Sequence, residues 1–134
     1  MNNLSERDAL TVYARMLNTC DPVEFESLLH RSFKAVSQFS FVDIASRDLY
    51  ITYVREKLKT IKISNDPLFA ELGILPAWGH EECVVIAQTF KENLVAVAYL
   101  TIDSQVVTRL DICAVPSPYS SKRTGYYPGL VMSC

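Results

Sequence analysis

The sequence lacks the features that mark several large classes of protein. No apolar run approaches the roughly 20 residues that a membrane-spanning helix needs. Lys and Arg are scattered and form no basic stripe, whereas nucleic-acid binding needs clustered positive charge to neutralise phosphates. The first ten residues, "MNNLSERDAL", contain acidic groups and no apolar core, so we expect no signal peptide. We therefore predict a cytoplasmic protein that binds neither nucleic acid nor membrane.

The cysteines lack the spacing of a zinc or redox motif. There are four of them, Cys20, Cys83, Cys113 and Cys134. Without an export signal, we expect them to stay reduced. Cys83 and Cys113 lie in strand-like segments, where free cysteines usually pack as small apolar groups.

A metal site is not indicated either. His80, Glu81 and Glu82 are consecutive, and three consecutive residues rarely converge on one ion. We expect a solvated turn there, no metal and no cofactor. His30 is the other histidine, and we expect it to end a helix, where a cation interacts favourably with the helix dipole.

What the sequence does contain is typical of one globular domain. The 134 residues are 49% hydrophobic and 21% charged, with a formal net charge of −2. That length is enough to bury a sizeable core. We predict a single domain over 1–134, with a tail rich in Pro, Ser and Gly from about residue 117.

The first half of the chain predicts helices. Ser5, with Asp8 three residues later, resembles a capping box and starts the first helix. Asp21 and Pro22 are typical of the start of a second helix, over 21–30. Ser46 precedes a third, over 46–61, with apolar residues at helical spacing. Between the last two, 33–42 predicts a strand or short hairpin.

The second half predicts strands only. Four segments alternate or are strongly apolar, and they cover 67–75, 83–90, 94–102 and 106–115. Short turns join the last three, which favours an antiparallel meander. Helices early in the chain and antiparallel strands late indicate an α+β fold, with the sheet curled around the helices.

This order resembles the nuclear transport factor 2-like fold, shared with ketosteroid isomerase and SnoaL-like polyketide cyclases. The resemblance covers roughly residues 4–116 and is carried by "YARMLNTCDPVEFESLL", "SRDLYITYVREKL" and the final meander. It implies a cone-shaped α+β barrel, with three helices on a strongly bent, mainly antiparallel sheet and a pocket at the wide end. More narrowly, "AELG", "CVVIAQ", "RLDICAVP" and "GYYPG" look like segments of uncharacterised bacterial proteins of this fold.

The resemblance does not carry the isomerase chemistry over. The first-helix tyrosine matches Tyr13, but the base position falls at Ser37 or Gln38, and neither accepts a proton near neutral pH. The second acid falls at Ala98. Proteins of one fold have many different functions, so the resemblance alone does not predict an activity.

Arg109 and Asp111 are the main candidates for a site, because they lie two residues apart on one face of an apolar strand. The resemblance implies that this face lines the pocket, with Ala96, Ala98 and Leu100 of the preceding strand. A pocket arginine favours an anionic ligand. The alternative is an exposed sheet face with a weak ion pair.

Four other residues are candidates for the pocket. Tyr13 and Tyr53 offer hydroxyls, although a tyrosine such as Tyr13 more often belongs to the core. Gln38 points either inward or to solvent. Trp78, the one tryptophan, either closes the pocket mouth or lies in a dimer contact.

We expect the outer sheet face to form a homodimer, because Val95, Val97, Tyr99 and Thr101 are too apolar for open water. Lys122 and Arg123 are expected to be solvated, and "TGYYPG" is typical of a docked tail, over the surface or across a partner. Three functions stay open. The first is a domain that binds a small organic ligand, with an anion favoured. The second is a cofactor-independent isomerase, cyclase or dehydratase with Asp111 as base and Tyr13 as donor, and the third is an interaction module with a filled pocket.

Overall fold

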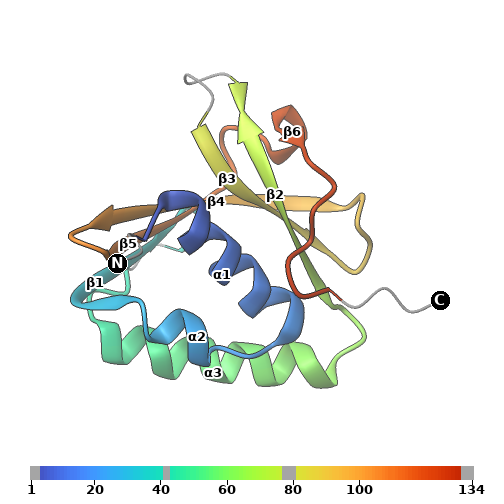
Figure 1. Ribbon diagram of the computed structural model, residues 1–134. Coiled ribbons are helices and arrows are strands. Elements are labelled where there is room, and N and C mark those ends of the chain that lie inside the picture. The colour runs from blue at the N-terminus through green and yellow to red at the C-terminus, as the bar shows by residue number, and fades with distance from the viewer. Residues whose placement is uncertain (1–3, 41–42, 77–80, 131–134) are drawn as a thin grey trace.

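The computed structural model describes residues 4–40, 43–76 and 81–130. This part of the chain forms three α-helices and six strands, in the order helix, helix, strand, helix and then the remaining strands (Figure 1). The helices are α1 (Glu6–Thr19), α2 (Val23–Glu26) and α3 (Arg47–Ile63). The strands are β1 (Leu29–Ser37), β2 (Leu68–Leu75), β3 (Glu81–Gln88), β4 (Leu94–Asp103), β5 (Val106–Cys113) and β6 (Lys122–Arg123). None of the described helices is long and apolar enough to cross a membrane.

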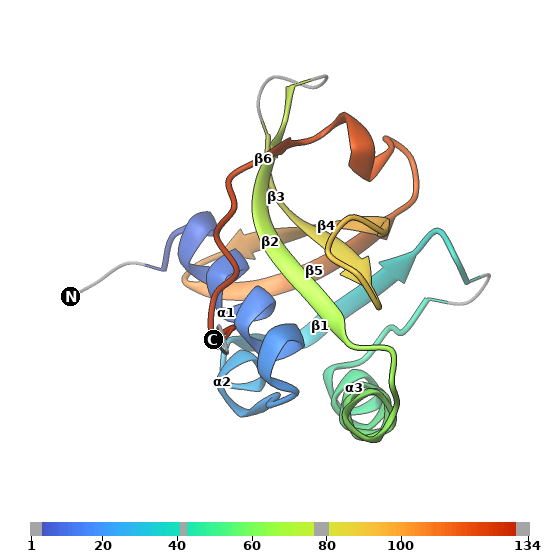
Figure 2. The same cartoon turned by 90° about the vertical axis from the view of Figure 1, so that its right-hand side faces the viewer.

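The strands form one sheet in the order β1-β5-β4-β3-β2-β6. Only the β1–β5 pair is parallel, and the meander β2–β3–β4–β5 is antiparallel, as predicted. The sheet curls without closing, and α1 lies across its concave face (Figures 1 and 2). We call this face the inner face and the opposite one the outer face. The predicted α+β cone is confirmed.

Local signals placed α1 and α3 correctly. The Ser5 side chain accepts from the Asp8 N–H and the Asp8 carboxylate accepts from the Ser5 N–H, which completes the capping box. Ser46 caps α3 in the same way, through the N–H of Leu49.

The predicted second helix is too long. The chain leaves α2 after Glu26, because residues from Leu29 onward pair with β5. Pairing in the sheet thus overrides the helical signal of 27–30. His30 consequently lies within β1, where its ring Nδ1 accepts from the Ser32 N–H at 3.1 Å. The prediction that it ends a helix is wrong.

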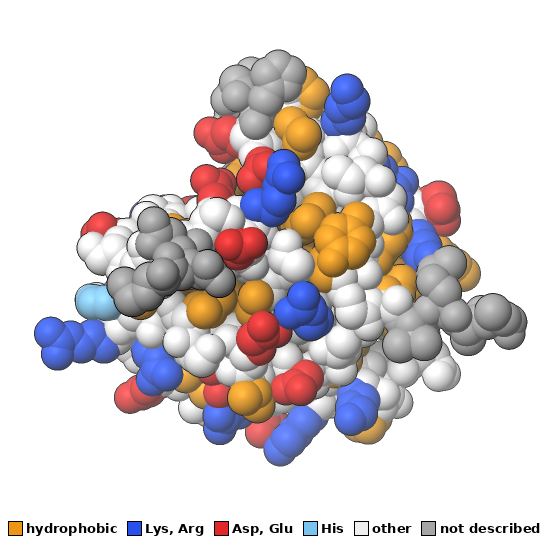
Figure 3. Space-filling model, viewed as in Figure 1, with side chains coloured by type: hydrophobic (Ala, Val, Ile, Leu, Met, Phe, Trp, Pro, Cys, Tyr) orange, Lys and Arg blue, Asp and Glu red, His pale blue; other side chains and the backbone are white. Residues whose placement is uncertain are grey.

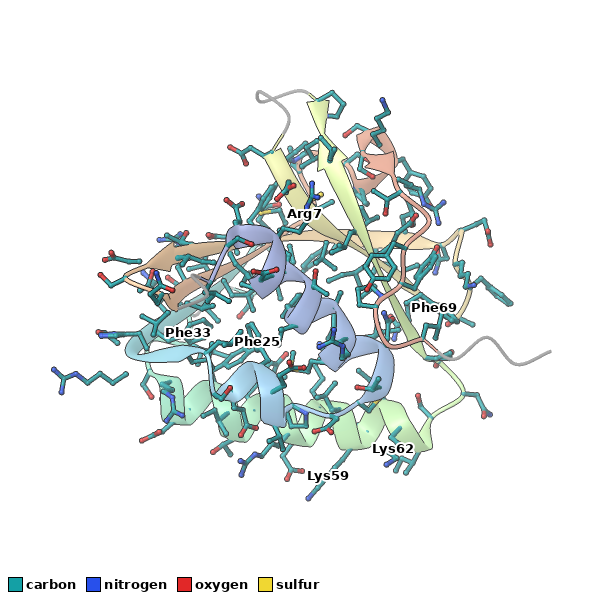
Figure 4. The ribbon with its side chains drawn as sticks, in the orientation of Figure 1. Arg7, Phe25, Phe33, Lys59, Lys62 and Phe69 are labelled. Carbon is teal, nitrogen blue, oxygen red and sulfur yellow. The ribbon has the colours of Figure 1, made fainter. Side chains whose placement is uncertain are left out.

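Aromatic side chains fill the space between the helices and the inner face. Tyr13 of α1 meets Phe25 of α2 edge-on, with ring centroids 5.1 Å apart. Tyr50 of α3 contacts Phe33 of β1 at 4.9 Å. All four side chains are at most 3% exposed. Figure 4 shows Phe25 and Phe33 in this layer between α1 and α3.

The C-terminal segment docks on its own chain. Residues 122–128 run beside β2 (Figure 1), and we call them the strap. Its anchor is Glu71 of β2, which is only 2% exposed. The Glu71 carboxylate accepts from Arg123 Nε at 2.7 Å, from the Gly125 N–H at 2.6 Å and from the Tyr127 hydroxyl at 3.2 Å. Lys122 and Arg123 are both exposed, as predicted, but Arg123 also holds the buried Glu71 carboxylate.

The other end of the strap is held by α1. Asn18 Nδ2 donates to the Pro128 carbonyl at 2.8 Å and to the Ala70 carbonyl at 2.9 Å. Its Oδ1 accepts from the Ala70 N–H at 2.7 Å. One amide thus joins helix, sheet and strap.

The outer face carries a second apolar cluster, formed by Leu75, Cys83, Val85, Ala87, Leu94 and Val97. The segment after β5 returns over this side through the short helix η2 (Pro118–Ser120) (Figure 2), where the Tyr119 hydroxyl accepts from the Leu94 N–H at 3.1 Å. Val97 is 0% exposed within this single chain. Its burial therefore needs no second subunit, which removes one reason for the predicted dimer. The core role predicted for Cys83 is confirmed.

Candidate functional site

The sheet forks, and the fork forms a groove. The β3–β4 ladder begins at Val84 and Ala98, so Glu81–Cys83 of β3 pair with β2, and 99–103 of β4 pair with β5. Figure 1 shows β2 and β3 rising away from β4 and β5. A groove of about 810 Å³ lies at this point. The described residues that line it are Glu6, Gln38, Glu81, Glu82, Tyr99, Leu100, Thr101, Ile102, Asp111, Cys113 and Val115. We call it the fork groove.

The strand register decides which face carries Arg109 and Asp111. Asp111 lies opposite Tyr99, and Arg109 lies opposite Thr101, whereas Leu110 lies opposite Leu100 in the core. Directly paired residues of antiparallel strands share a face. Arg109 and Asp111 therefore belong to the outer face.

The inward placement of Arg109 and Asp111 is a wrong prediction. Ala96, Ala98 and Leu100 do point inward as expected, and all three belong to the inner core. Because Leu110 pairs with Leu100, an inward Leu100 forces both neighbours of Leu110 to the other side of the sheet.

Arg109 and Asp111 bind each other. Arg109 Nε donates to both carboxylate oxygens of Asp111, at 3.1 and 2.9 Å, and its Nη2 donates to Oδ1 at 3.0 Å. This hydrogen-bonded contact, followed by the charge of Asp111, raises the pKa of Arg109. Both charges are compensated, so the guanidinium is a poor recruiter of an anion, and the carboxylate is a poor general base.

Tyr99 contributes the least satisfied polar atom of the groove. Its hydroxyl is buried and has no hydrogen-bond partner in the part of the chain that the structure describes. Burial raises the pKa of Tyr99, and the neighbouring thiols of Cys83 and Cys113 add to the effect. A buried polar group without a partner costs about 1–3 kcal/mol, so a ligand that bonds to it recovers that energy.

Carboxylates line the opposite side of the groove. Arg7 of α1 donates from Nε to Glu82 of β3 at 2.9 Å, and Figure 4 shows Arg7 directed toward these strands. Glu6 and Glu81 have no ion pair among the described residues. Burial raises the pKa of Glu6, as do the nearby charges of Glu82 and Glu81. This side of the groove therefore has uncompensated negative charge.

Gln38 lies at the edge of the groove and is fully engaged. Its Oε1 accepts from the N–H groups of Ala114 and Val115, at 2.7 and 2.9 Å. Its Nε2 donates to the Val115 carbonyl at 3.0 Å. The side chain joins the end of β1 to the segment after β5, which is a structural task.

The remaining candidates lie elsewhere. Tyr13 is 2% exposed in the inner core, and burial raises its pKa, with a smaller contribution from Tyr53. Tyr53 is 48% exposed on α3, where Lys57 Nζ approaches its hydroxyl at 3.3 Å. Trp78 falls outside the described residues. Tyr13 and Asp111 lie on opposite faces of the sheet, so the fold does not bring together the proposed donor and base.

Sequence reasoning missed three groups of the fork groove. Tyr99 and Cys113 could have been found from strand pairing, because both share the outer face with Asp111. Glu6 had no local signal, since only the packing of α1 brings it to the start of β3. No cluster of three metal-binding side chains occurs among the residues described.

Comparison with solved structures identifies the fold. The chain is similar to a nuclear transport factor 2-like protein of unknown function from Cytophaga hutchinsonii, with 13% identity, 88% of this chain and 96% of that chain covered, and a TM-score of 0.59. A SnoaL-like protein of unknown function from Burkholderia thailandensis has 12% identity, 92% and 100% coverage and a TM-score of 0.58. A Catenulispora acidiphila protein with a ketosteroid isomerase-like fold, in complex with trimethylamine, has 11% identity, 95% and 96% coverage and a TM-score of 0.53.

The sequence comparisons found no matching family model and no matching curated protein. The narrower resemblance to one set of bacterial proteins therefore stays a prediction. The architecture and the solved structures agree with each other: the chain has the nuclear transport factor 2-like fold.

Proposed function

We propose that the protein binds a small organic molecule in the fork groove, at the point where β3 and β4 separate. The observation that carries this proposal is the buried, unpartnered hydroxyl of Tyr99 beside an open groove of about 810 Å³. That volume is in the range of ligand sites, and the lining mixes apolar side chains with a few polar groups. The inner face offers less room, because Tyr13, Phe25 and Tyr50 fill it.

The charge of the lining favours a cationic ligand over the anionic one suggested by the sequence. Arg7 and Arg109 are each bound to a carboxylate, whereas Glu6 and Glu81 are unpaired in the described chain. A protonated amine would compensate these charges and donate a hydrogen bond to the Tyr99 hydroxyl oxygen. The Catenulispora relative is in complex with trimethylamine, which is itself cationic near neutral pH.

The test begins with a native mass spectrum of protein purified gently from its expression host. An added mass of a few hundred daltons would supply a ligand to identify. Calorimetry with matched small amines and carboxylates then measures the charge preference. We expect the amines to bind, and we expect Tyr99→Phe to weaken binding about tenfold, in line with the loss of one buried hydrogen bond.

Tyr126→Phe is the matched control, because Tyr126 is 52% exposed and does not line the groove. Equal affinity of wild type and Tyr99→Phe for every bound amine would contradict the role of the hydroxyl. A preference for carboxylates would contradict the cationic class.

The filled inner face supports a second candidate, an interaction module with no ligand. Four aromatic rings occupy the space where the fold implies a pocket. This alternative predicts a clean native spectrum and no binding of amines. An enzyme with Asp111 as base receives no support from the geometry, because Arg109 holds both of its carboxylate oxygens.

The homodimer stays a proposal that is supported by a few exposed apolar side chains. Phe39 and Val115 are 62% and 69% exposed, and Gln38 ties the segments that carry them together. A dimer that buries these side chains would also cover the fork groove. Light scattering after size exclusion gives the mass in solution, and a monomer at micromolar concentration would contradict the dimer.

A further inference from the structure

A second concave surface lies between α2 and α3, far from the fork groove in the fold. It is a groove of about 530 Å³, which we call the helix groove. Its apolar wall is formed by Pro22 and Val23, and its charged wall by Arg55, Lys59 and Lys62 of α3. Val23 is 67% exposed, although it is aliphatic and lies on a wall of a groove.

The walls of the helix groove are fixed to each other. Glu26 of α2 is 7% exposed and accepts from Arg55 Nε and Nη2 of α3, at 2.8 and 2.6 Å. Arg47 Nη2 also donates to the Glu26 carbonyl, at 3.4 Å. The neighbouring Phe25 contacts Tyr50 of α3, with ring centroids 6.4 Å apart. The groove is therefore preformed, which lowers the entropic cost of binding.

Two lysines of this groove are available to a partner. Lys59 has one distant contact, to Glu56 at 3.8 Å, and both side chains are about three-quarters exposed, so the pair contributes little. Lys62 has no ion pair among the described residues. Burial raises the pKa of the Cys20 thiol in the groove, and the charge of Lys62 acts in the opposite direction to lower it. Figure 4 shows Lys59 and Lys62 on the same lower side of α3.

The charge of α3 is opposite to that of the molecule. Within Arg47–Ile63 there are five cations and two carboxylates, while the chain as a whole has a net charge of −2. Figure 3 shows Lys and Arg side chains along the lower margin, over α3. Such a separation attracts an acidic partner to one side of the protein and repels it from the rest.

We propose that the helix groove binds an acidic peptide segment of a partner protein. Lys59 and Lys62 are three residues apart on one helix, so their ammonium groups can meet two carboxylates of one short segment. An apolar side chain of the same segment would rest against Pro22 and Val23. This mixture of one aliphatic wall and two free cations fits a peptide better than a polyphosphate, which needs more positive charge and no apolar wall.

A bilayer surface fits less well. The exposed aliphatic residue forms a wall of a concave groove, whereas a membrane-bound helix presents a convex apolar face. Glu56 also lines the groove, between Arg55 and Lys59. A carboxylate at this position would repel an anionic lipid surface. A peptide can place its own acidic residues away from it.

The experiment uses the full chain and a short fluorescent peptide in which Asp and Glu alternate with Leu. Its anisotropy is measured at low and at physiological salt. We expect saturable binding of the peptide. We expect the Lys59→Glu/Lys62→Glu variant to bind at least about tenfold more weakly, because each lost charge contact at an interface lowers the affinity. Arg31→Glu/Lys122→Glu is the charge-matched control, because both residues are exposed and lie on β1 and β6.

A second measurement tests the apolar wall independently of the charged wall. Val23→Ser leaves all charges in place, and we expect it to weaken binding of the Leu-containing peptide severalfold but not of a peptide with Ser in place of Leu. Equal losses in the two double variants would overturn the proposal, because binding would then depend only on net charge. Binding of phosphatidylserine vesicles through Lys59 and Lys62 without peptide binding would overturn it in favour of a membrane. Neither result depends on the fork groove.

Discussion

The two faces of the sheet differ in the kind of contacts that cover them. The inner face is closed by helices through aromatic and aliphatic contacts, and Tyr13, Phe25 and Phe33 are at most 2% exposed there. The outer face is covered by the returning C-terminal segment through hydrogen bonds and ion pairs around Glu71. The fork groove lies where β3 and β4 separate, and Tyr99 and Asp111 of the outer face line it together with Glu6 of α1.

The difference teaches that the open groove of a chain can lie away from the place that its fold implies. The fold implies a pocket between sheet and helices, yet large side chains occupy that position in this chain. The polar groups that sequence analysis assigned to the pocket, Arg109 and Asp111, lie on the opposite face. Binding functions reside in the side chains that a fold displays rather than in the fold itself.

The largest expected effect comes from a substitution in the core of the inner face. Phe25→Ala removes a side chain that is 0% exposed and contacts both Tyr13 and Tyr50, so we expect a loss of about 3–5 kcal/mol in the free energy of unfolding. Phe39→Ala is the matched control at the surface, where the ring is 62% exposed, and we expect a change within about 0.5 kcal/mol. Urea unfolding followed by circular dichroism measures both. Similar losses would show that the inner face is no more tightly packed than the surface.

The next effect releases the strap from the outer face. Glu71→Ala removes the acceptor for Arg123, Gly125 and Tyr127, so we expect a loss of about 2–3 kcal/mol, the scale for breaking a buried polar network. Glu82→Ala removes the partner of Arg7, where both side chains are more exposed, and should cost less than about 1 kcal/mol.

Hydrogen exchange of the strap distinguishes release from a general loss of stability. In Glu71→Ala, the amide of Thr124, which bonds to the Leu72 carbonyl at 3.3 Å, should exchange faster relative to α1. Uniform acceleration across the molecule would instead mean that strap and core unfold together.

The same comparison explains what the sequence could predict. The capping box at Ser5 and Asp8 and the alternation of 94–113 act locally, and the elements they predict are present. The length of α2 depended on pairing of β1 with β5, which lies far along the chain. Glu71 looked like any polar residue of a strand, because its partner Arg123 follows 52 residues later.

The site was harder to predict than the fold for a related reason. Alternation shows that Arg109 and Asp111 share a face, but not which face that is. The choice depends on register with β4, where Leu100 and Leu110 pair inside the core. Applying that register to the sequence would have placed both residues outside, beside Tyr99.

The smallest expected effect, as measured at pH 10, appears only in alkaline solution and concerns the outer cluster. Burial raises the pKa of Cys83 from its ordinary value of 9.0 to about 12, so the folded chain holds this proton where the unfolded chain releases it. Stability is therefore unaffected below about pH 9 and falls between pH 9 and 12, by up to about 1.4 kcal/mol for each pH unit from this one group. Buried tyrosines of the inner face add to the decline above pH 10, because their pKa values are raised as well. Cys83→Ala isolates the contribution of this thiol. Urea unfolding at pH 8 and at pH 10 should show a smaller pH-dependent loss of stability in the variant than in wild type. Cys113→Ala, in a half-buried position on the same face, should change that loss less. An identical loss in wild type and Cys83→Ala would assign the alkaline sensitivity to the buried tyrosines of both faces rather than to this thiol.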